Sequence, residues 1–136
     1  MADLFSDFTM NILVRSLDAD AMNHLLITNN IANVNTPGYH RMEVSFKDQL
    51  KDLLNDKKLK GTRTHPNHLP IGGPISLDNL MPQAIVDNQT VMRTDGNNVD
   101  IDKEMAKLSD NSGEYSGLTH LLTYKFMLLD TAMGAQ

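Results

Sequence analysis

An unbroken heptad-like stripe near the C-terminal end most limits the folds open to this 136-residue chain. From residue 101 to residue 133 its positions alternate spacings of four and three, which is typical of a helix face that packs against another helix. Asp100 suits the N-cap, and acidic residues follow in the first turn. The pattern predicts a helix over residues 100–136 whose seam consists of Ile101, Met105, Leu108, Tyr115, Leu122, Phe126, Leu129 and Met133, with the small polar residues Ser112 and Thr119 between them.

A second apolar stripe occupies the N-terminal end of the chain. It predicts a helix over roughly residues 3–33, within an N-terminal region 1–36 that Pro37 and Gly38 bring to an end. Both helices would be about 45 Å long, so we expect a mainly α fold in which they pair as an antiparallel coiled coil. The seam residues of this first helix are Phe5, Phe8, Ile12, Ala19, Met22 and Leu26.

The middle of the chain, residues 37–99, has a loop-rich composition. Four of the five prolines lie between residues 57 and 82. Residues 46–54 have a pattern that favours a short helix. Residues 84–101 alternate apolar and polar side chains around an Asp95-Gly96 turn, which predicts one or two short strands and allows a hairpin. Because two long helices form only a thin core, such a chain should need partners, most simply copies of itself.

Composition argues against several classes of function. The net charge of −5 argues against nucleic acid binding, and the absence of cysteine excludes thiolate metal sites and disulfides. We expect no transmembrane segment, no cleaved signal peptide, no cofactor and no enzymatic activity. His65 and His68 lack further ligands for a metal, so we interpret them as part of an exposed turn. The segment after Asp95 fails as a calcium loop, because Val99 or Lys103 falls where a ligand or a glycine is required.

Small residues recur every four positions on the predicted C-terminal helix, at Ser109, Gly113 and Gly117. One interpretation is a tolerated weak point or a kink, since a helical glycine costs about 1 kcal/mol relative to alanine. The other is a second helix face that neighbouring subunits approach closely. Both interpretations stay open on the sequence alone.

The stretch NNIANVNTPGYHR, residues 29–41, ends the first helix with an unusual number of amides. Asparagine is a poor helix-interior residue, but its amide can bond the unpaired carbonyls of a helix end or a neighbouring chain. The stretch could therefore be a plain helix stop or a junction between subunits. We expect it to serve assembly, through Asn30, Ile31, Ala32, Asn33, Asn35, Thr36, Pro37, Gly38 and Tyr39.

This stretch closely resembles the signature of the flagellar rod and hook family, N-x-[LI]-A-N-x-x-T-x-G-[FY]-[KR]. His40 stands where the family usually has a basic residue, and the basic residue follows at Arg41. The resemblance continues through THPNHL at residues 64–69 and DGNNVDIDKEMAKL at residues 95–108. Both segments, and the short length, are similar to the proximal rod subunits of the FlgB type.

The resemblance implies a structural subunit of the bacterial flagellar basal body. Its terminal helices would form an inner layer that stacks helically around the export channel. It would leave the cell uncleaved through the flagellar type III export apparatus and assemble in the periplasm. Expected partners are copies of itself, other rod proteins, the adaptor between export gate and rod, and the membrane ring. The alternative from the residues is a coiled-coil adaptor that binds one helical partner without polymerising.

Overall fold

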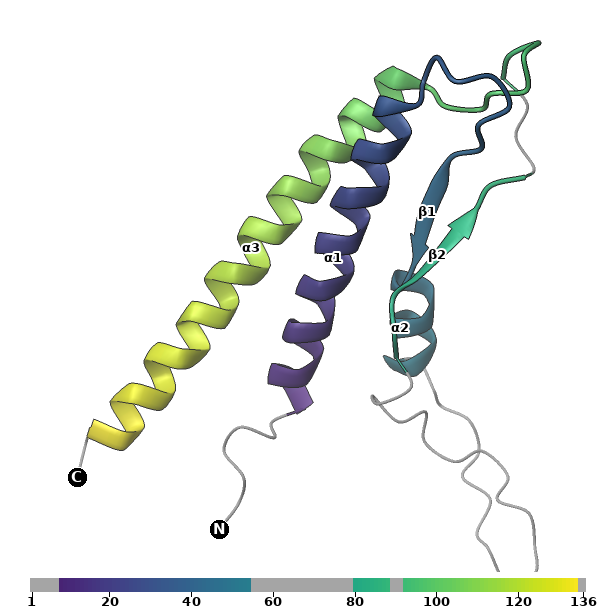
Figure 1. Ribbon diagram of the computed structural model, residues 1–136. Helices are drawn as coiled ribbons and strands as arrows, with labels where there is room; N and C mark the ends of the chain where they lie inside the picture. Colours follow the sequence, from purple (N-terminus) through teal and green to yellow (C-terminus); the bar gives the residue numbers. More distant parts are fainter. Residues whose placement is uncertain (1–7, 55–79, 89–91, 135–136) are drawn as a thin grey trace, which may run out of the picture.

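Two long helices at the ends of the chain dominate the architecture (Figure 1). The computed structural model describes residues 8–54, 80–88 and 92–134. The elements, in chain order, are α1 (Phe8–Ala32), β1 (Met42–Ser45), α2 (Lys47–Leu54), β2 (Gln83–Val86) and α3 (Ile101–Gly134). The predicted mainly α class is confirmed. The predictions for Phe5, His65, His68 and the THPNHL segment lie outside the described residues.

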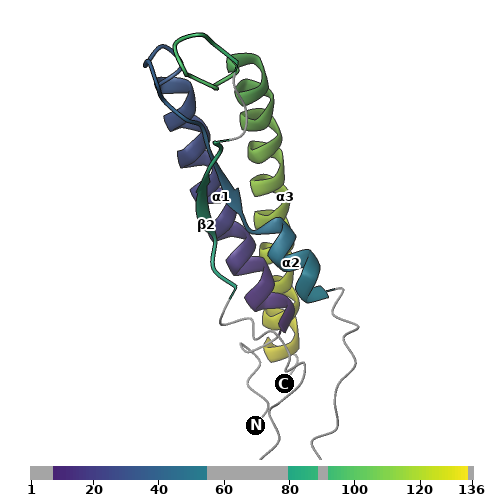
Figure 2. The same cartoon turned by 90° about the vertical axis from the view of Figure 1, so that its right-hand side faces the viewer.

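Helices α1 and α3 contact each other and run in opposite directions (Figures 1 and 2). The end of α1 lies beside the start of α3, and the two helices separate toward the chain termini in the view of Figure 1. In the same view α1 lies between α3 and the small sheet. The closed end of the helix pair is therefore the end from which the middle of the chain emerges.

The start of α3 is fixed by the predicted cap. The Oδ1 atom of Asp100 accepts hydrogen bonds from the backbone N–H groups of Asp102, at 3.1 Å, and Lys103, at 3.3 Å. These two groups are among the donors that a helix start leaves unpaired. The bonds lower the pKa of the Asp100 carboxyl group. Helix α3 therefore begins at Ile101 because Asp100 caps it, as the sequence predicted.

The sheet differs from the predicted arrangement. Strand β2 pairs antiparallel with β1, with Met42 opposite Val86 and Ser45 opposite Gln83. Within the described part of the chain, no hairpin forms around Asp95 and Gly96, which instead lie in a turn without flanking strands. The four residues of β1 are too few to show a strand alternation in the sequence, and their partner is far along the chain.

A small apolar core fastens the sheet and α2 to α1. Ala19 of α1, Phe46 and Leu80 are buried together, and Val44 and Leu50 pack against them. The guanidinium of Arg15, which interrupts the apolar stripe of α1, donates a hydrogen bond of 2.8 Å to the carbonyl oxygen of Leu80. The apolar core and this hydrogen bond hold β1, α2 and the residue Leu80 before β2 against α1.

Candidate functional site

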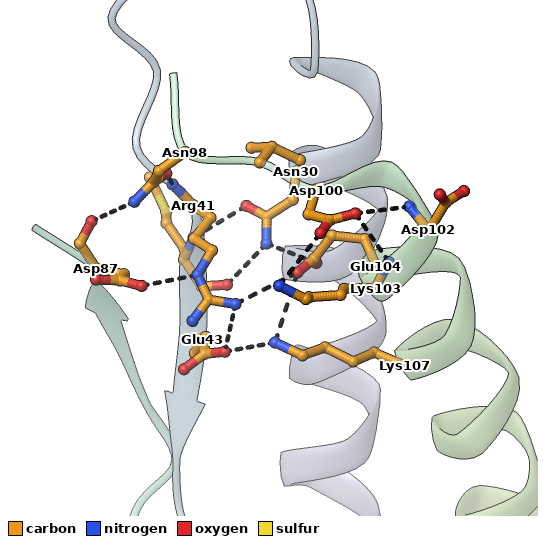
Figure 3. A network of polar contacts seen from close by, with 12 residues as sticks. Asn30, Arg41, Glu43, Asp87, Asn98, Asp100, Asp102, Lys103, Glu104 and Lys107 are labelled. Atoms are coloured by element: carbon orange, nitrogen blue, oxygen red, sulfur yellow. Dashed lines mark hydrogen bonds and ion pairs between the residues drawn. The ribbon is translucent and has the colours of Figure 1, made fainter. Parts of the chain in front are cut away.

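The site is a group of polar side chains at the closed end of the helix pair, here called the polar clasp (Figure 3), and four of them are buried. It joins the end of α1, both strands and the start of α3. Its members are Asn30, Arg41, Glu43, Asp87, Asn97, Asn98, Glu104 and Lys107.

Asn30 is the centre of the polar clasp and is 0% exposed. Its Nδ2 atom donates to the carbonyl oxygen of Met42 and to Oε2 of Glu104, both at 2.9 Å. Its Oδ1 atom accepts from the backbone N–H of Met42, at 2.9 Å, and from the hydroxyl of Tyr39, at 3.2 Å. One amide thus binds α1 to β1 as a neighbouring strand would and also to α3 (Figure 3).

Asn97 holds the turn that follows α1 and is also 0% exposed. Its Nδ2 atom donates to the carbonyl oxygens of Asn33, Val34 and Thr36, at 2.9, 3.1 and 2.9 Å. Its Oδ1 atom accepts from the backbone N–H of Val99 at 2.7 Å. A side chain from just before α3 therefore binds three carbonyl groups of the turn that follows α1.

Asn98 connects the chain before β1 to the chain after β2. Its Oδ1 atom accepts from the backbone N–H of Arg41, and its Nδ2 atom donates to the carbonyl oxygen of Asp87, both at 2.7 Å. It is 1% exposed. Asn97 binds the turn after α1, and the adjacent Asn98 binds the segments that flank the sheet. The short segment before α3 therefore sets the position of this turn relative to the sheet.

Charged side chains complete the polar clasp. The Nε atom of Arg41 donates to Asp87 at 2.8 Å, and its Nη1 atom lies 3.0 Å from Glu43 and 3.7 Å from Glu104. Lys107 pairs with Glu43 and lies 3.5 Å from Oε1 of Glu104. Burial by itself would lower the pKa of Arg41, but the bond to Asp87 and the nearby carboxylates raise it. The guanidinium therefore stays charged and tethers β1 to β2 and α3.

Two glycines with positive φ shape the turns beside the polar clasp. Gly38 has a φ of 70° and Gly96 a φ of 83°, a region that side-chain-bearing residues rarely adopt. The backbone N–H of Gly38 donates to the carbonyl oxygen of Asp95 at 3.0 Å. A Cβ atom on Gly96 would lie 3.6 Å from the Cα atom of Gly38. The TPGY turn and the DG turn thus lie against each other, although 57 residues separate Gly38 from Asp95.

A comparison with protein-family models finds a match in this same part of the chain, and the match to known relatives extends over most of the chain. The family model described as "Flagella basal body rod protein" matches residues 26–40, which form the end of α1 and the following turn. The FlgB basal body rod protein of Bacillus subtilis is 32% identical over 130 residues, which are 96% of this chain and 95% of the relative. This chain belongs to the FlgB family of flagellar basal body rod proteins.

Other FlgB proteins have similar overlaps. The relative from Borreliella burgdorferi is 30% identical over 88% of this chain and 90% of its own length. The relative from Salmonella typhimurium is 30% identical over 85% of this chain and 86% of its own length. The match to FlgB proteins therefore spans both long helices and the middle, beyond the short family signature.

The residues of the family signature have different surroundings in this FlgB-family chain. Asn30 is buried, and Tyr39 is half-buried with its pKa raised by burial and by the charge of Glu104. The Nδ2 atom of Asn33 donates to the Asn29 carbonyl oxygen at 2.8 Å, and its Oδ1 atom accepts from Thr36 at 3.2 Å. Ile31 is half-buried, whereas the exposed positions are Ala32, Asn35, Thr36, Pro37 and Gly38.

The predicted seam is only partly buried between the helices. Ala19 and Leu26 are buried, and the half-buried members are Ile12, Met22, Leu108, Leu122 and Leu129. The remaining described members are exposed in the single chain, and their place in a helix seam stays a prediction: Phe8, Ile101, Met105, Tyr115, Phe126 and Met133.

The physical reason lies in the rotation of α3. Its two buried residues are Glu104 and Asn111, each one position before a predicted seam residue, Met105 or Ser112. One residue corresponds to about 100° around a helix. Glu104 bonds Asn30, and Asn111 bonds the backbone carbonyl of Asp20 at 3.1 Å. These hydrogen bonds turn a partly polar face of α3 toward α1 and leave much of the apolar stripe outside.

The small-residue face also points outward. Ser109, Gly113 and Gly117 are exposed, and a Cβ atom built on either glycine meets nothing within 4 Å. The described part of the chain therefore gives these glycines no close packing partner, and an inter-subunit role for them stays a prediction.

Sequence reasoning missed every member of the polar clasp except Asn30, namely Arg41, Glu43, Asp87, Asn97, Asn98, Glu104 and Lys107. One available signal was the asparagine pair between a DG turn and a helix cap, because asparagine at such a place often bonds backbone groups. Within the described segments, no group of three or more potential ligands could hold a metal ion. No helix in those segments has the length and apolar character of a membrane span.

Proposed function

We propose that this chain is a structural subunit of the flagellar proximal rod and polymerises helically around the export channel. In this proposal α1 and α3 pair as an antiparallel coiled coil in the inner layer of the rod. Membership of the FlgB family supports the assignment to the rod. Its partners would be copies of itself, other rod proteins, the adaptor between export gate and rod, the membrane ring and the type III export apparatus.

The observation that carries the proposal is the apolar surface on the two long helices. Among the described residues, large apolar side chains are more often exposed than buried. Soluble monomers rarely leave contiguous apolar surface larger than a few hundred Å² uncovered. On α3 the exposed members are Ile101, Met105, Tyr115, Leu121, Tyr124, Phe126, Met127, Leu128 and Met133.

The distribution of exposed apolar side chains suits a polymerising subunit better than an adaptor that binds one partner. Tyr124 and Phe126 are 59% and 50% exposed, although they lie only two residues apart and so point in widely different directions from α3. A helix that binds one partner needs one apolar stripe. Apolar residues on more than one side favour contact with several neighbours, as in a helical assembly. Export without a cleaved signal peptide and assembly on the periplasmic side belong to this proposal.

A deletion strain tests the proposal. We expect cells lacking this chain to secrete other rod proteins but to form no complete rod, and expression of the chain to restore rods. In a density map of purified basal bodies the chain should lie at the base of the rod. A stable dimer or heterodimer in solution, together with intact rods in the deletion strain, would favour the adaptor function instead.

A further inference from the structure

An acidic hollow of about 320 Å³ lies between α1, α3 and the segment from β1 into α2. The share of liquid volume that one water takes is about 30 Å³, so the hollow has room for more than a few waters. Two lysines, Lys47 and Lys107, line it. The carboxylates that line it are Asp20, Glu43, Asp48, Glu104, Asp110 and Glu114.

Asp20 is the unusual member of this lining. It is 7% exposed, and its Oδ2 atom has no hydrogen-bond donor among the described residues. The nearby donors are occupied elsewhere, because Lys47 bonds Glu114 at 2.6 and 2.7 Å and Asn111 bonds the backbone of Asp20. Burial raises the pKa of Asp20, and the charge of Glu114 raises it further, against a smaller lowering by Lys47.

Glu104 presents a second incompletely paired oxygen to the hollow. It is 1% exposed, and its Oε1 atom has no hydrogen-bond donor in the described part of the chain. Arg41 and Lys107 compensate its charge from 3.7 and 3.5 Å. Buried carboxylate oxygens are normally hydrogen-bonded. Asp20 Oδ2, which has no such cations paired with it among the described residues, is therefore the atom that indicates a missing donor.

An apolar groove of about 490 Å³ adjoins the hollow and shares Asp20, Phe46, Lys47 and Glu114 with it. The apolar side chains that line the groove are Phe46, Leu50, Leu118 and Leu121. The combination of apolar walls and a buried carboxylate fits a side chain with an aliphatic stem and a cationic head. Lysine and arginine have this form, and they bury their stems while their heads find charged or solvated partners.

We propose that this pocket receives a lysine or arginine side chain from a neighbouring rod subunit, with the stem in the apolar groove and the head group donating to Asp20 Oδ2. The inference rests on the proposed function, because the neighbour is a rod subunit. A metal ion is a poorer occupant, since the described residues contain no group of three ligands arranged to hold one.

Asp20→Asn tests the proposal, with Asp18→Asn on the exposed side of α1 as the matched control. Asparagine keeps the shape of Asp20 but removes the charge that attracts the cation. We expect Asp20→Asn to secrete subunit normally but to give fewer completed rods by about tenfold or more, as when one partner of a buried charge pair is lost. Asp18→Asn should complete rods normally. The isolated Asp20→Asn protein should unfold at the same or a higher urea concentration than the parent, which excludes misfolding as the cause.

Second-site suppressors sharpen the test. Asp20→Lys should block rod completion, and restored motility should map to a lysine or arginine of a rod subunit changed to an acidic residue. Normal rod yield with Asp20→Asn would overturn the proposal, as would suppressors confined to Lys47 or Lys107 of the same chain. If the deletion strain itself builds complete rods, the proposed function fails. If only the deletion strain is defective and Asp20→Asn is normal, the docking pocket alone fails.

Discussion

The two ends of the helix pair are held by different means. At the closed end, Asn30, Asn97 and Asn98 are almost completely buried and form hydrogen bonds with backbone groups of four chain segments. Toward the termini the described residues of α3 are half-buried or exposed, and these include Phe126, Met127 and Met133. Near the N-terminal end of α1, Met10 and Leu13 are buried within the chain. A single chain therefore specifies its closed end by itself and leaves the C-terminal part of α3 for neighbours to cover.

The contrast has a chemical basis. Buried amides need partners in fixed directions, so the polar clasp determines one arrangement of α1, the sheet and α3. Apolar side chains have no such directional requirement, and they can pack against whichever neighbouring helix covers them. A rod subunit that meets several neighbours benefits from both properties.

Asn30→Ala is the largest expected disruption of the closed end. It removes four hydrogen bonds and leaves both backbone groups of Met42 and a buried Glu104 oxygen without that partner. We expect the free energy of unfolding to fall by about 3 kcal/mol, because each buried group left unpaired costs about 1–3 kcal/mol. Urea unfolding measures the change. Asn35→Ala in the same motif is the control and should change stability by less than about 0.5 kcal/mol, since Asn35 is exposed.

The double change Gly113→Leu with Gly117→Leu should leave the closed end intact and block assembly. Open space surrounds both positions, and replacing a helical glycine by leucine gains roughly 0.5–1 kcal/mol of helix propensity. We expect normal or higher stability and secretion but few complete rods in purified basal bodies. The matched Gly113→Ala, Gly117→Ala protein should assemble. Normal rods with the leucine pair would show that this face touches no neighbour.

Gly113→Leu alone separates this face from the pocket near Asp20, because Gly117 lines the apolar groove and Gly113 does not. A rod defect in the single variant assigns the effect to the small-residue face.

Asn33→Ala should have a smaller effect, despite the place of Asn33 in the family signature. Both ends of its amide bond groups in its own turn, the Asn29 carbonyl and the Thr36 hydroxyl. We expect a loss of about 1 kcal/mol in unfolding free energy and rods at normal frequency. A failure to complete rods, with normal secretion, would instead show that Asn33 serves as a junction between subunits.

The smallest expected effect is a pH dependence at Asp20. Its raised pKa means that the folded chain holds this proton more tightly than the unfolded chain does. The stabilising contribution is therefore complete below the ordinary pKa of 3.8 and is lost as pH rises through the folded-state value. Urea unfolding of parent and Asp20→Asn proteins between pH 3.5 and pH 7 measures the difference. The free energy of unfolding of Asp20→Asn should rise relative to that of the parent as pH rises. A difference that does not change with pH would contradict the raised pKa of Asp20.

Much of the fold was predictable from local patterns. Helix periodicity located both long helices, and Asp100 marked the start of α3. The rotation of α3 was not predictable, because apolar residues such as Leu118, Leu121 and Met127 occupy several sides of the helix. Two hydrogen bonds decide which side faces α1: Glu104 accepts one from Asn30, and Asn111 donates one to the Asp20 carbonyl. The partners are 74 and 91 residues away along the chain.

The polar clasp illustrates the same limit. The amides of Asn30 and Asn33 were expected to bond helix-end carbonyls or a neighbouring chain. Asn33 does bond a helix-end carbonyl, that of Asn29. Asn97 bonds the carbonyls after α1, and Asn30 bonds β1 and α3 within the chain. Residue type indicated that the amides need partners, but only the fold identifies them.

Hydrogen–deuterium exchange tests the central claim most directly, that the chain fixes its closed end alone and depends on neighbours for the C-terminal part of α3. The experiment compares dilute isolated protein with purified basal bodies. In the isolated protein, amides of residues 26–32 and 101–111 should exchange slowly, whereas those of residues 121–134 should exchange within seconds and become protected only in the rod. Uniform, concentration-independent protection along all of α3 in the isolated protein would contradict the account.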